Sequence, residues 1–434
     1  MRIIRNLTLT FSVIWCHSSM AISLQQAVKL ALNHSHEYKI ALLKEEQSRL
    51  GFVVAWGAFL PAADFTMSAT KKGPFKSSSQ NSHATAIQLN QNIYNQPLMD
   101  KIKAARLVVA LSEKQASQVR SSLIQDVCTQ YGALVLALSS LDSKKASKNE
   151  LVKQYEEVKV KHKAGLANKG QLLLVETQLN RVNTEIESSR VNVMLSQSRL
   201  ELLLGTSVNR IQLFKKGELN LWLSNSESEQ WQSKAMDHNL EIHIAKLQQL
   251  QADNEYRVSI SNRLPVLSGK LIYQNNSQAR ESGLVSANQF NLSATIQLSA
   301  QLNATTVAMP YLQKKAAQMA ERHFQKIQES VMSQIDMTLN SIQDFQLRVK
   351  SERKAFILSR ESIDLSKSSY RQGVVTALEV LKTISDSLDV NLTLEKAKLD
   401  LLLNHVKLQS LTGGLDEVYI DKLSSYFESS HTAL

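Results

Sequence analysis

The sequence contains an internal duplication, and this feature restricts its fold more than any other. Leu60-Pro61 recurs as Leu264-Pro265 at an offset of 204 residues, and glycines recur at an offset of 208. When these two Leu-Pro pairs are aligned, Ala31, Leu32, His34, Glu37, Ile40 and Ala41 match Ala235, Met236, His238, Glu241, Ile244 and Ala245, while Gly165 and Gly205 match Gly373 and Gly413 at the second offset. Self-similarity at a fixed offset indicates repeated structural units. We predict one repeat over residues 22–207, a second over 208–415, and a tail over 416–434.

Each repeat contains a segment in which apolar and polar residues alternate. From Phe290 to Leu302, every second residue is apolar and the residues between are Asn, Ser, Thr or Gln. Alternation over about ten residues is typical of a barrel strand with one face toward lipid and one toward a wet lumen. We therefore predict hairpins over about 62–95 and about 265–303. An amphipathic sheet of a soluble protein has the same pattern and remains an alternative.

The segments around the hairpins have helical periodicity. We predict helices over 23–59, 98–163 and 169–204, and their repeats over 227–263, 311–371 and 376–411, with Pro97 and Pro310 preceding the two long helices. Two short helices placed end to end match one long helix in length. This match predicts that the helices form a cylinder wall of even height. Apolar residues recur every seventh position at Ile335, Ile342, Val349, Phe356, Ile363 and Tyr370, and at spacings of three and four at Leu172, Val175, Leu179, Val182 and Ile186. This spacing favours coiled-coil packing, although an ordinary helical core stripe fits any single helix equally well.

The first residues indicate export. Arg2 and Arg5 precede a short apolar stretch that leads to Ser19-Met20-Ala21, so we predict a signal peptide over residues 1–21. An anchoring helix is the alternative, but the stretch is shorter than the roughly 20 apolar residues that a span requires. Cleavage leaves Cys128 as the single thiol and lowers the formal charge from +11 to +9 through loss of the two arginines. No intrachain disulfide can then form, and an exported chain would rarely meet nucleic acid.

The sequence lacks the patterns of common catalytic and metal sites. It contains no Gly-rich phosphate loop, HExxH, CxxC or GxSxG motif. His34, His36 and His238 have no Cys or carboxylate at ligand spacing, so we interpret them as surface or packing residues. We therefore expect no enzyme activity, no cofactor and no metal.

The order of these elements resembles the TolC family of bacterial outer-membrane export ducts over nearly the whole mature chain. The markers are the opening Ser23-Leu24-Gln25-Gln26-Ala27-Val28, Leu60-Pro61, the turn Ala164-Gly165-Leu166, and Tyr370-Arg371-Gln372-Gly373 leading to Leu378-Glu379-Val380-Leu381. The resemblance implies a mostly α fold with a β-barrel portion, in which a long coiled-coil α-barrel joins a four-stranded contribution to a trimeric transmembrane β-barrel. The chain would be internally duplicated, as the sequence itself indicates.

The resemblance also implies a function and partners. The homotrimer would cross the outer-membrane lipid, extend its helical tunnel into the periplasm, and serve as a passive conduit in efflux or type I secretion. It would be opened by a periplasmic adaptor (membrane fusion) protein and an inner-membrane RND, ABC or MFS pump. An exported coiled-coil scaffold or adhesin without a pore is the alternative, but it has no use for two lipid-patterned hairpins.

The resemblance places the working site at the helix turns. Adaptor docking is expected at the turn residues Gly165, Leu166, Gly373 and Val374, and the periplasmic gate at Glu379, Gln171, Lys382 and Tyr370. Family members close this mouth with aspartates, whereas this chain has Gln171, Glu379 and Lys382 at the matching positions, and Val375 where an arginine would bond. An acidic gate is therefore only partly retained.

The segments next to the turns are rich in basic residues. From Lys144 to Lys169 there are eight Lys against three Glu, and the segment from Arg348 to Lys382 is also basic. A solvated helix surface is the plain interpretation. A basic mouth that favours anionic cargo or an acidic adaptor tip is the sharper hypothesis.

Overall fold

Two helices of equal length form the frame of the chain in this computed structural model, which describes residues 21–72, 80–215, 228–280 and 287–429. The helices α3 (Gln96–Lys163) and α7 (Ala304–Arg371) have 68 residues each, which corresponds to about 100 Å. Residues 1–20 of the predicted signal peptide, residues 73–79 within the first predicted hairpin and residues 430–434 of the tail lie outside the described residues.

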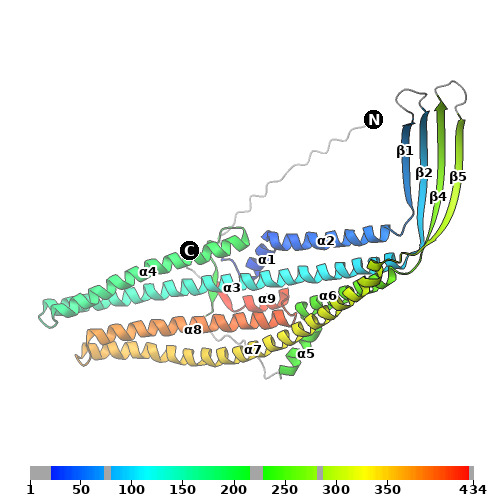
Figure 1. Cartoon of the computed structure of the whole chain (residues 1–434). Helices are drawn as coiled ribbons and strands as arrows, with labels where there is room; N and C mark the ends of the chain where they lie inside the picture. Colours follow the sequence, from blue (N-terminus) through cyan, green and yellow to red (C-terminus); the bar gives the residue numbers. More distant parts are fainter. Residues whose placement is uncertain (1–20, 73–79, 216–227, 281–286, 430–434) are drawn as a thin grey trace.

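Shorter helices pair with both halves of each long helix. In the first repeat, α2 (His36–Gly57) and α4 (Lys169–Leu204) pack along α3, and in the second, α6 (Leu240–Ser261) and α8 (Ala377–Leu411) pack along α7. Figure 1 shows the hairpins α3/α4 and α7/α8 extending to one end of the molecule and the strands rising at the other. The predicted match between two short helices and one long helix is therefore present in both repeats.

The first helix of each repeat is broken, which corrects our prediction of one helix over 23–59 and another over 227–263. Ser35 separates α1 (Leu24–His34) from α2, and Asn239 separates α5 (Ser228–His238) from α6. Each accepts a hydrogen bond from a backbone N–H three residues ahead, at 3.2 Å for Ser35 and 3.0 Å for Asn239. Ser and Asn side chains of this kind begin a new helix, because they satisfy a donor that has no partner within it.

Pro310 lies inside α7 rather than before it, which is a second correction. A proline within a helix has no N–H for the carbonyl four residues earlier, which is the carbonyl of Thr306. Arg263 supplies the missing donors from the end of α6: its Nε donates to the Thr306 carbonyl at 2.9 Å and its Nη2 to the Val307 carbonyl at 2.7 Å. The helix can therefore start seven residues earlier than the proline pattern predicted.

We expect Arg263→Ala to lower the apparent melting midpoint of the detergent-purified protein by roughly 2–5 °C, because two charge-assisted hydrogen bonds at the proline are lost. The measurement is circular dichroism on heating. Arg257→Ala is the matched control, since Arg257 is exposed on α6, which ends just before Arg263, and it has no hydrogen bond or ion pair within the described residues. An equal loss in both variants would show that the Thr306 carbonyl does not depend on Arg263.

The four long strands form one antiparallel sheet. Its order is β1 (Ala62–Lys72), β2 (Gln80–Tyr94), β4 (Val266–Arg280) and β5 (Ala287–Ser299), so the two repeats meet at the β2/β4 pair. The register aligns Phe65, Ile87, Tyr273 and Leu292 in one row across all four strands, and all four side chains are exposed. Strands of 11 to 15 residues are long enough to cross a bilayer.

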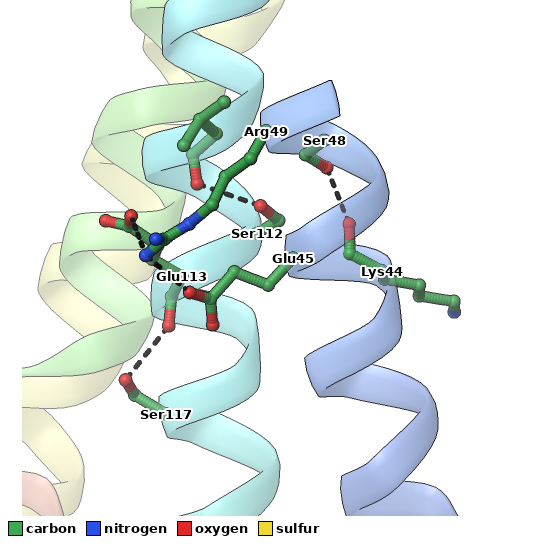
Figure 2. A network of polar contacts seen from close by, with 8 residues as sticks. Lys44, Glu45, Ser48, Arg49, Ser112, Glu113 and Ser117 are labelled. Carbon is green, nitrogen blue, oxygen red and sulfur yellow. Dashed lines mark hydrogen bonds and ion pairs between the residues drawn. The ribbon is translucent and has the colours of Figure 1, made fainter. Parts of the chain in front are cut away.

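The helical core follows the predicted heptad positions. Ile335 and Ile342 on α7 are buried, as are Val175, Val182 and Ile186 on α4. The repeats join along α3 and α8, where Gly132 lets the two helices approach so closely that an added Cβ would overlap the Leu399 side chain. A surface ion pair also links α2 to α3: Arg49 lies 2.8 Å from Glu45 and 3.0 Å from Glu113 (Figure 2).

A small sheet closes the middle of the molecule. It pairs β3 (Gln212–Phe214) with β6 (Phe427–Ser429), which follows α9 (Glu417–Ser424). The hydroxyl of Tyr131 on α3 donates toward the carbonyls of Ile22 and Gln212, at 3.0 and 3.1 Å. The first described residues are thereby tied to the helical core.

Candidate functional site at the helix turns

The two helix turns have the same backbone geometry. Gly165 and Gly373 both have φ of +76°. In the first turn the Leu166 N–H donates to the Lys161 carbonyl at 2.8 Å, and in the second the Val374 N–H donates to the Ser369 carbonyl at 2.9 Å. This bond closes a helix over a residue in the left-handed region, a conformation that glycine adopts without a Cβ penalty. The positive φ that each turn requires therefore explains why glycine recurs at this position in both repeats.

Each turn presents an apolar side chain to solvent. Leu166 is 79% exposed and Val374 is 74% exposed, and each directly follows the turn glycine. No residue of the described chain covers either side chain. Two of the four positions that we predicted for adaptor docking, Leu166 and Val374, therefore present uncovered apolar side chains at the end of the molecule.

Three of the four predicted gate residues lie on the helices that leave the turns, Gln171 on α4 and Glu379 and Lys382 on α8. The Gln171 N–H is bonded to the Asn168 side chain at 2.8 Å, and Glu379 completes a capping box with Thr376. Lys382 is exposed one turn further on. Within the described residues, no hydrogen bond or ion pair joins Gln171 with Glu379. The Glu379 carboxylate is thus engaged with its own helix start in this single chain.

Tyr370 is the predicted gate residue with a partner on the other repeat. It is buried, and the Lys161 ammonium lies 3.9 Å from the centre of its ring. Lys161 also pairs with Glu157 on its own helix at 3.3 Å. A cation over an aromatic face is attracted by the ring quadrupole, so this contact links the end of α3 to the end of α7.

A second link joins the same two helices. Lys367 on α7 forms a close ion pair and hydrogen bond with Glu150 on α3. The hydrogen bond from Lys367 lowers the pKa of the Glu150 carboxyl below its usual value, and the burial of the carboxyl opposes this shift only in part. We name the pair of links Glu150–Lys367 and Lys161–Tyr370 the mouth latch. The sequence did not predict Glu150, Lys161 or Lys367 as site residues, because spacing along one helix does not identify a partner on another.

A cavity near the middle of the molecule is a different feature that sequence reasoning missed. It has a volume of about 410 Å³, and Glu37, Asp126 and Glu241 are among its lining residues. Burial, and then the nearby Glu37 charge, raises the pKa of the Asp126 carboxyl. Glu37 and Glu241 are equivalent residues of the two repeats. The duplication was therefore the one feature of the sequence that could have pointed to these two carboxyl groups. The cavity is large enough to hold water.

The described residues offer little for metal or thiol chemistry. No group of three or more His, Cys, Asp and Glu side chains among them could hold a metal ion. Cys128 is buried, and burial raises the pKa of its thiol to about 12, so the reactive thiolate is not formed at neutral pH. His34 packs against Gly205, the left-handed residue that ends α4. In the part of the chain that is described, no helix has the length and apolarity needed to cross a membrane.

A four-stranded sheet with an exposed apolar row, carried on paired helical hairpins that end in uncovered turns, defines the subunit of a channel-tunnel. The sequence model of the family described as "Outer membrane efflux protein" matches residues 231–414. The outer membrane protein TolC of Vibrio cholerae serotype O1 is 20% identical over 338 residues, which cover 77% of each chain. The second repeat therefore matches the outer membrane efflux protein family, and the whole chain resembles TolC, an outer-membrane protein; the chain lies in the outer membrane with its helical tunnel in the periplasm.

Solved channel structures have the same fold. CusC superposes with a TM-score of 0.79 at 16% identity, covering 90% of this chain and 92% of that one. The CmeC outer membrane channel of Campylobacter jejuni gives 0.77 at 17% identity, with 93% and 90% covered. The MtrE channel of Neisseria gonorrhoeae, solved in its open state, gives 0.77 at 16% identity, with 91% and 90% covered. These likenesses confirm the predicted fold class, in a single chain whose sheet is not closed into a barrel. The family match and the TolC relative support the conduit function and not the scaffold or adhesin alternative.

Proposed function

We propose that three copies of this chain form an outer-membrane conduit whose periplasmic mouth receives cargo through an adaptor protein from an inner-membrane pump. The single observation that carries the proposal is the open sheet. A barrel needs about eight strands to close, and one chain contributes a sheet of four with two unpaired edges, β1 and β5. Unpaired edges in lipid leave backbone groups without partners, so the sheet requires further copies.

Uncovered apolar faces on the helices support the same assembly. Leu43, Val53 and Val54 on α2 are exposed, and so are Leu312, Met319 and Leu365 on α7. Large exposed apolar side chains gathered on a helix face are typical of an interaction surface. A neighbouring copy would bury them.

The assembly test measures mass and conductance. We expect the detergent-purified mature protein to have the mass of three chains and to conduct ions in planar bilayers. A protein that is monomeric and soluble without detergent would contradict the proposal and would favour the scaffold alternative.

The adaptor would dock on the turns. Leu166 and Val374 are exposed, and each could fill an apolar pocket of a partner helix, as anchor residues do in interfaces. The gate would lie beside them, with Gln171, Glu379 and Lys382 near the opening and Tyr370 holding the hairpins together through the mouth latch.

Photocrosslinking tests the docking surface. We expect a photoreactive residue at position 166 or 374 to capture an adaptor anchored in the inner membrane. Position 202 is the control, since Leu202 is equally exposed but lies near the other end of α4. Capture of the same adaptor from position 202 alone would place the docking surface away from the turns.

A further inference from the structure

The residues closest to the helix turns carry a concentrated positive charge. We define the basic tip as residues 158–174 and 366–382, which contain the two turns. It has seven Lys and Arg (Lys159, Lys161, Lys163, Lys169, Lys367, Arg371 and Lys382) and one acidic residue (Glu379), a formal charge of +6 per chain. The basic character noted for the longer segments is therefore concentrated at the end of the molecule.

Four of these cations are free. Lys163, Lys169, Arg371 and Lys382 are exposed, and none has an ion pair within the described residues. The other three point toward acidic residues further from the turns: Lys159 pairs with Glu156, Lys161 with Glu157, and Lys367 with Glu150. The charge that reaches solvent at the tip is thus carried mainly by the four free cations.

Helix dipoles do not account for this arrangement. Lys163 and Arg371 lie in the last turns of α3 and α7, where a cation is favourable. Lys169, in contrast, is the first residue of α4, where the helix dipole disfavours a cation and where no acidic residue is present. Each hairpin also presents one helix start and one helix end, so the dipoles largely cancel and the side chains decide the local field.

An acidic band follows the basic tip along the helices. The next eight residues on each side (150–157, 175–182, 358–365 and 383–390) carry a formal charge of −5 per chain. On each helix the centre of the acidic band lies roughly 8 to 9 residues, or about 13 Å, from the centre of the adjoining arm of the basic tip, which exceeds the Debye length of about 8 Å at physiological salt. A solute at the mouth therefore responds to the basic tip and is screened from the acidic band.

From this charge arrangement we propose that the basic tip makes the periplasmic mouth anion-selective, so that the conduit favours anionic cargo. The inference rests on the proposed function, because it requires several copies to bring their tips around one opening. Walls of one sign raise the local concentration of ions of the opposite sign, most strongly where the opening is narrow. Lys163, Lys169 and Arg371 would be the specificity-determining residues.

The experiment is the reversal potential of the purified channel in a planar bilayer under a KCl gradient. We expect chloride to be at least about three times as permeant as potassium, because a uniformly charged mouth concentrates counter-ions by about tenfold or more. The triple variant K163E/K169E/R371E should lower this ratio below one. Glu150 and Tyr370 are unchanged in this variant, so the mouth latch is kept.

The matched control is K145E/K350E/K354E. It changes the charge by the same amount at exposed positions beyond the acidic band. We expect its permeability ratio to stay near that of the unmodified protein. A cation preference of the unmodified channel, or an equal shift in the control, would overturn the inference. A protein without any conductance would instead contradict the proposed function.

Discussion

Gly413→Ala is expected to destabilise the protein by about 2–5 kcal/mol, whereas Gly373→Ala costs only about 1–2 kcal/mol. Both glycines have positive φ, at +69° and +76°. A residue with a Cβ is strained in this region, so both variants share that cost. What differs is the surrounding space.

The space around Gly413 is closed by a neighbouring backbone. An added Cβ would lie 2.7 Å from the His238 carbonyl oxygen and 2.9 Å from its Cβ, whereas nothing lies within 4 Å at Gly373. A backbone carbonyl at the junction of α5 and α6 cannot swing away as a side-chain tip can. Gly413→Ala therefore adds an overpacking cost to the strain.

The measurement is the melting midpoint and trimer yield of each variant in detergent. Gly51→Ala completes the series, since Gly51 is helical with open space around it, and this change should stabilise the protein by about 0.5–1 kcal/mol. Equal losses for Gly413→Ala and Gly373→Ala would show that backbone strain alone sets the cost.

Removing the mouth latch is expected to open the channel. We estimate about 1–2 kcal/mol per chain for its cation–π contact and partly exposed ion pair together. If three chains open in concert, loss of the latch shifts the closed–open equilibrium by about 10²–10⁴-fold. The double variant Glu150→Ala with Tyr370→Ala should therefore raise single-channel conductance several-fold, while all tip lysines remain.

Two control variants distinguish loss of the mouth latch from a general effect of substitution on the channel. Tyr370→Phe keeps the aromatic face under Lys161 and should conduct like the unmodified protein. Glu156→Ala removes the same charge as Glu150→Ala, but its partner Lys159 lies on the same helix at 3.5 Å, so no link between hairpins is lost. Increased conductance in either control, at the level of the double variant, would contradict a latch.

The latch also predicts a response to acid. Hydrogen bonding from Lys367 lowers the pKa of Glu150 from its ordinary value of 4.5, so the link is fully present above pH 4.5. It is lost as the pH falls through the lowered pKa, because the protonated carboxyl no longer attracts the ammonium. Conductance should rise on acidification below pH 4.5, and Glu150→Gln should remove that part of the response.

Much of the fold could be predicted from periodicity and duplication. The strands and long helices follow directly from the change between alternating and helical spacing, and α4 occupies the predicted range of 169–204. The two helix breaks were missed because Ser35 and Asn239 look like ordinary polar residues within a helical pattern. Pro310 was misplaced because the donor that compensates for it, Arg263, lies 47 residues away in the sequence.

The site residues also fall into those that the sequence could predict and those that it could not. Gly165 and Gly373 could be found because a left-handed turn restricts the local residue type. Glu150 and Lys367 could not be found, since they belong to different repeats and their side chains meet only in the folded chain. The reason for the repeated His34 and His238 was also hidden until the structure placed them against Gly205 and Gly413.

The sequence by itself determined the elements of this protein: which segments are helix or strand, where the turns fall, and that two repeats share one plan. These properties depend on neighbours within a few residues, and each residue carries its own preference. The tertiary structure alone decided the register of the β2/β4 pair, the close approach of Gly132 to Leu399, and the partners in the mouth latch. Such contacts depend on how distant helices and strands pack, and that arrangement is set by the summed burial of many side chains rather than by any local pattern.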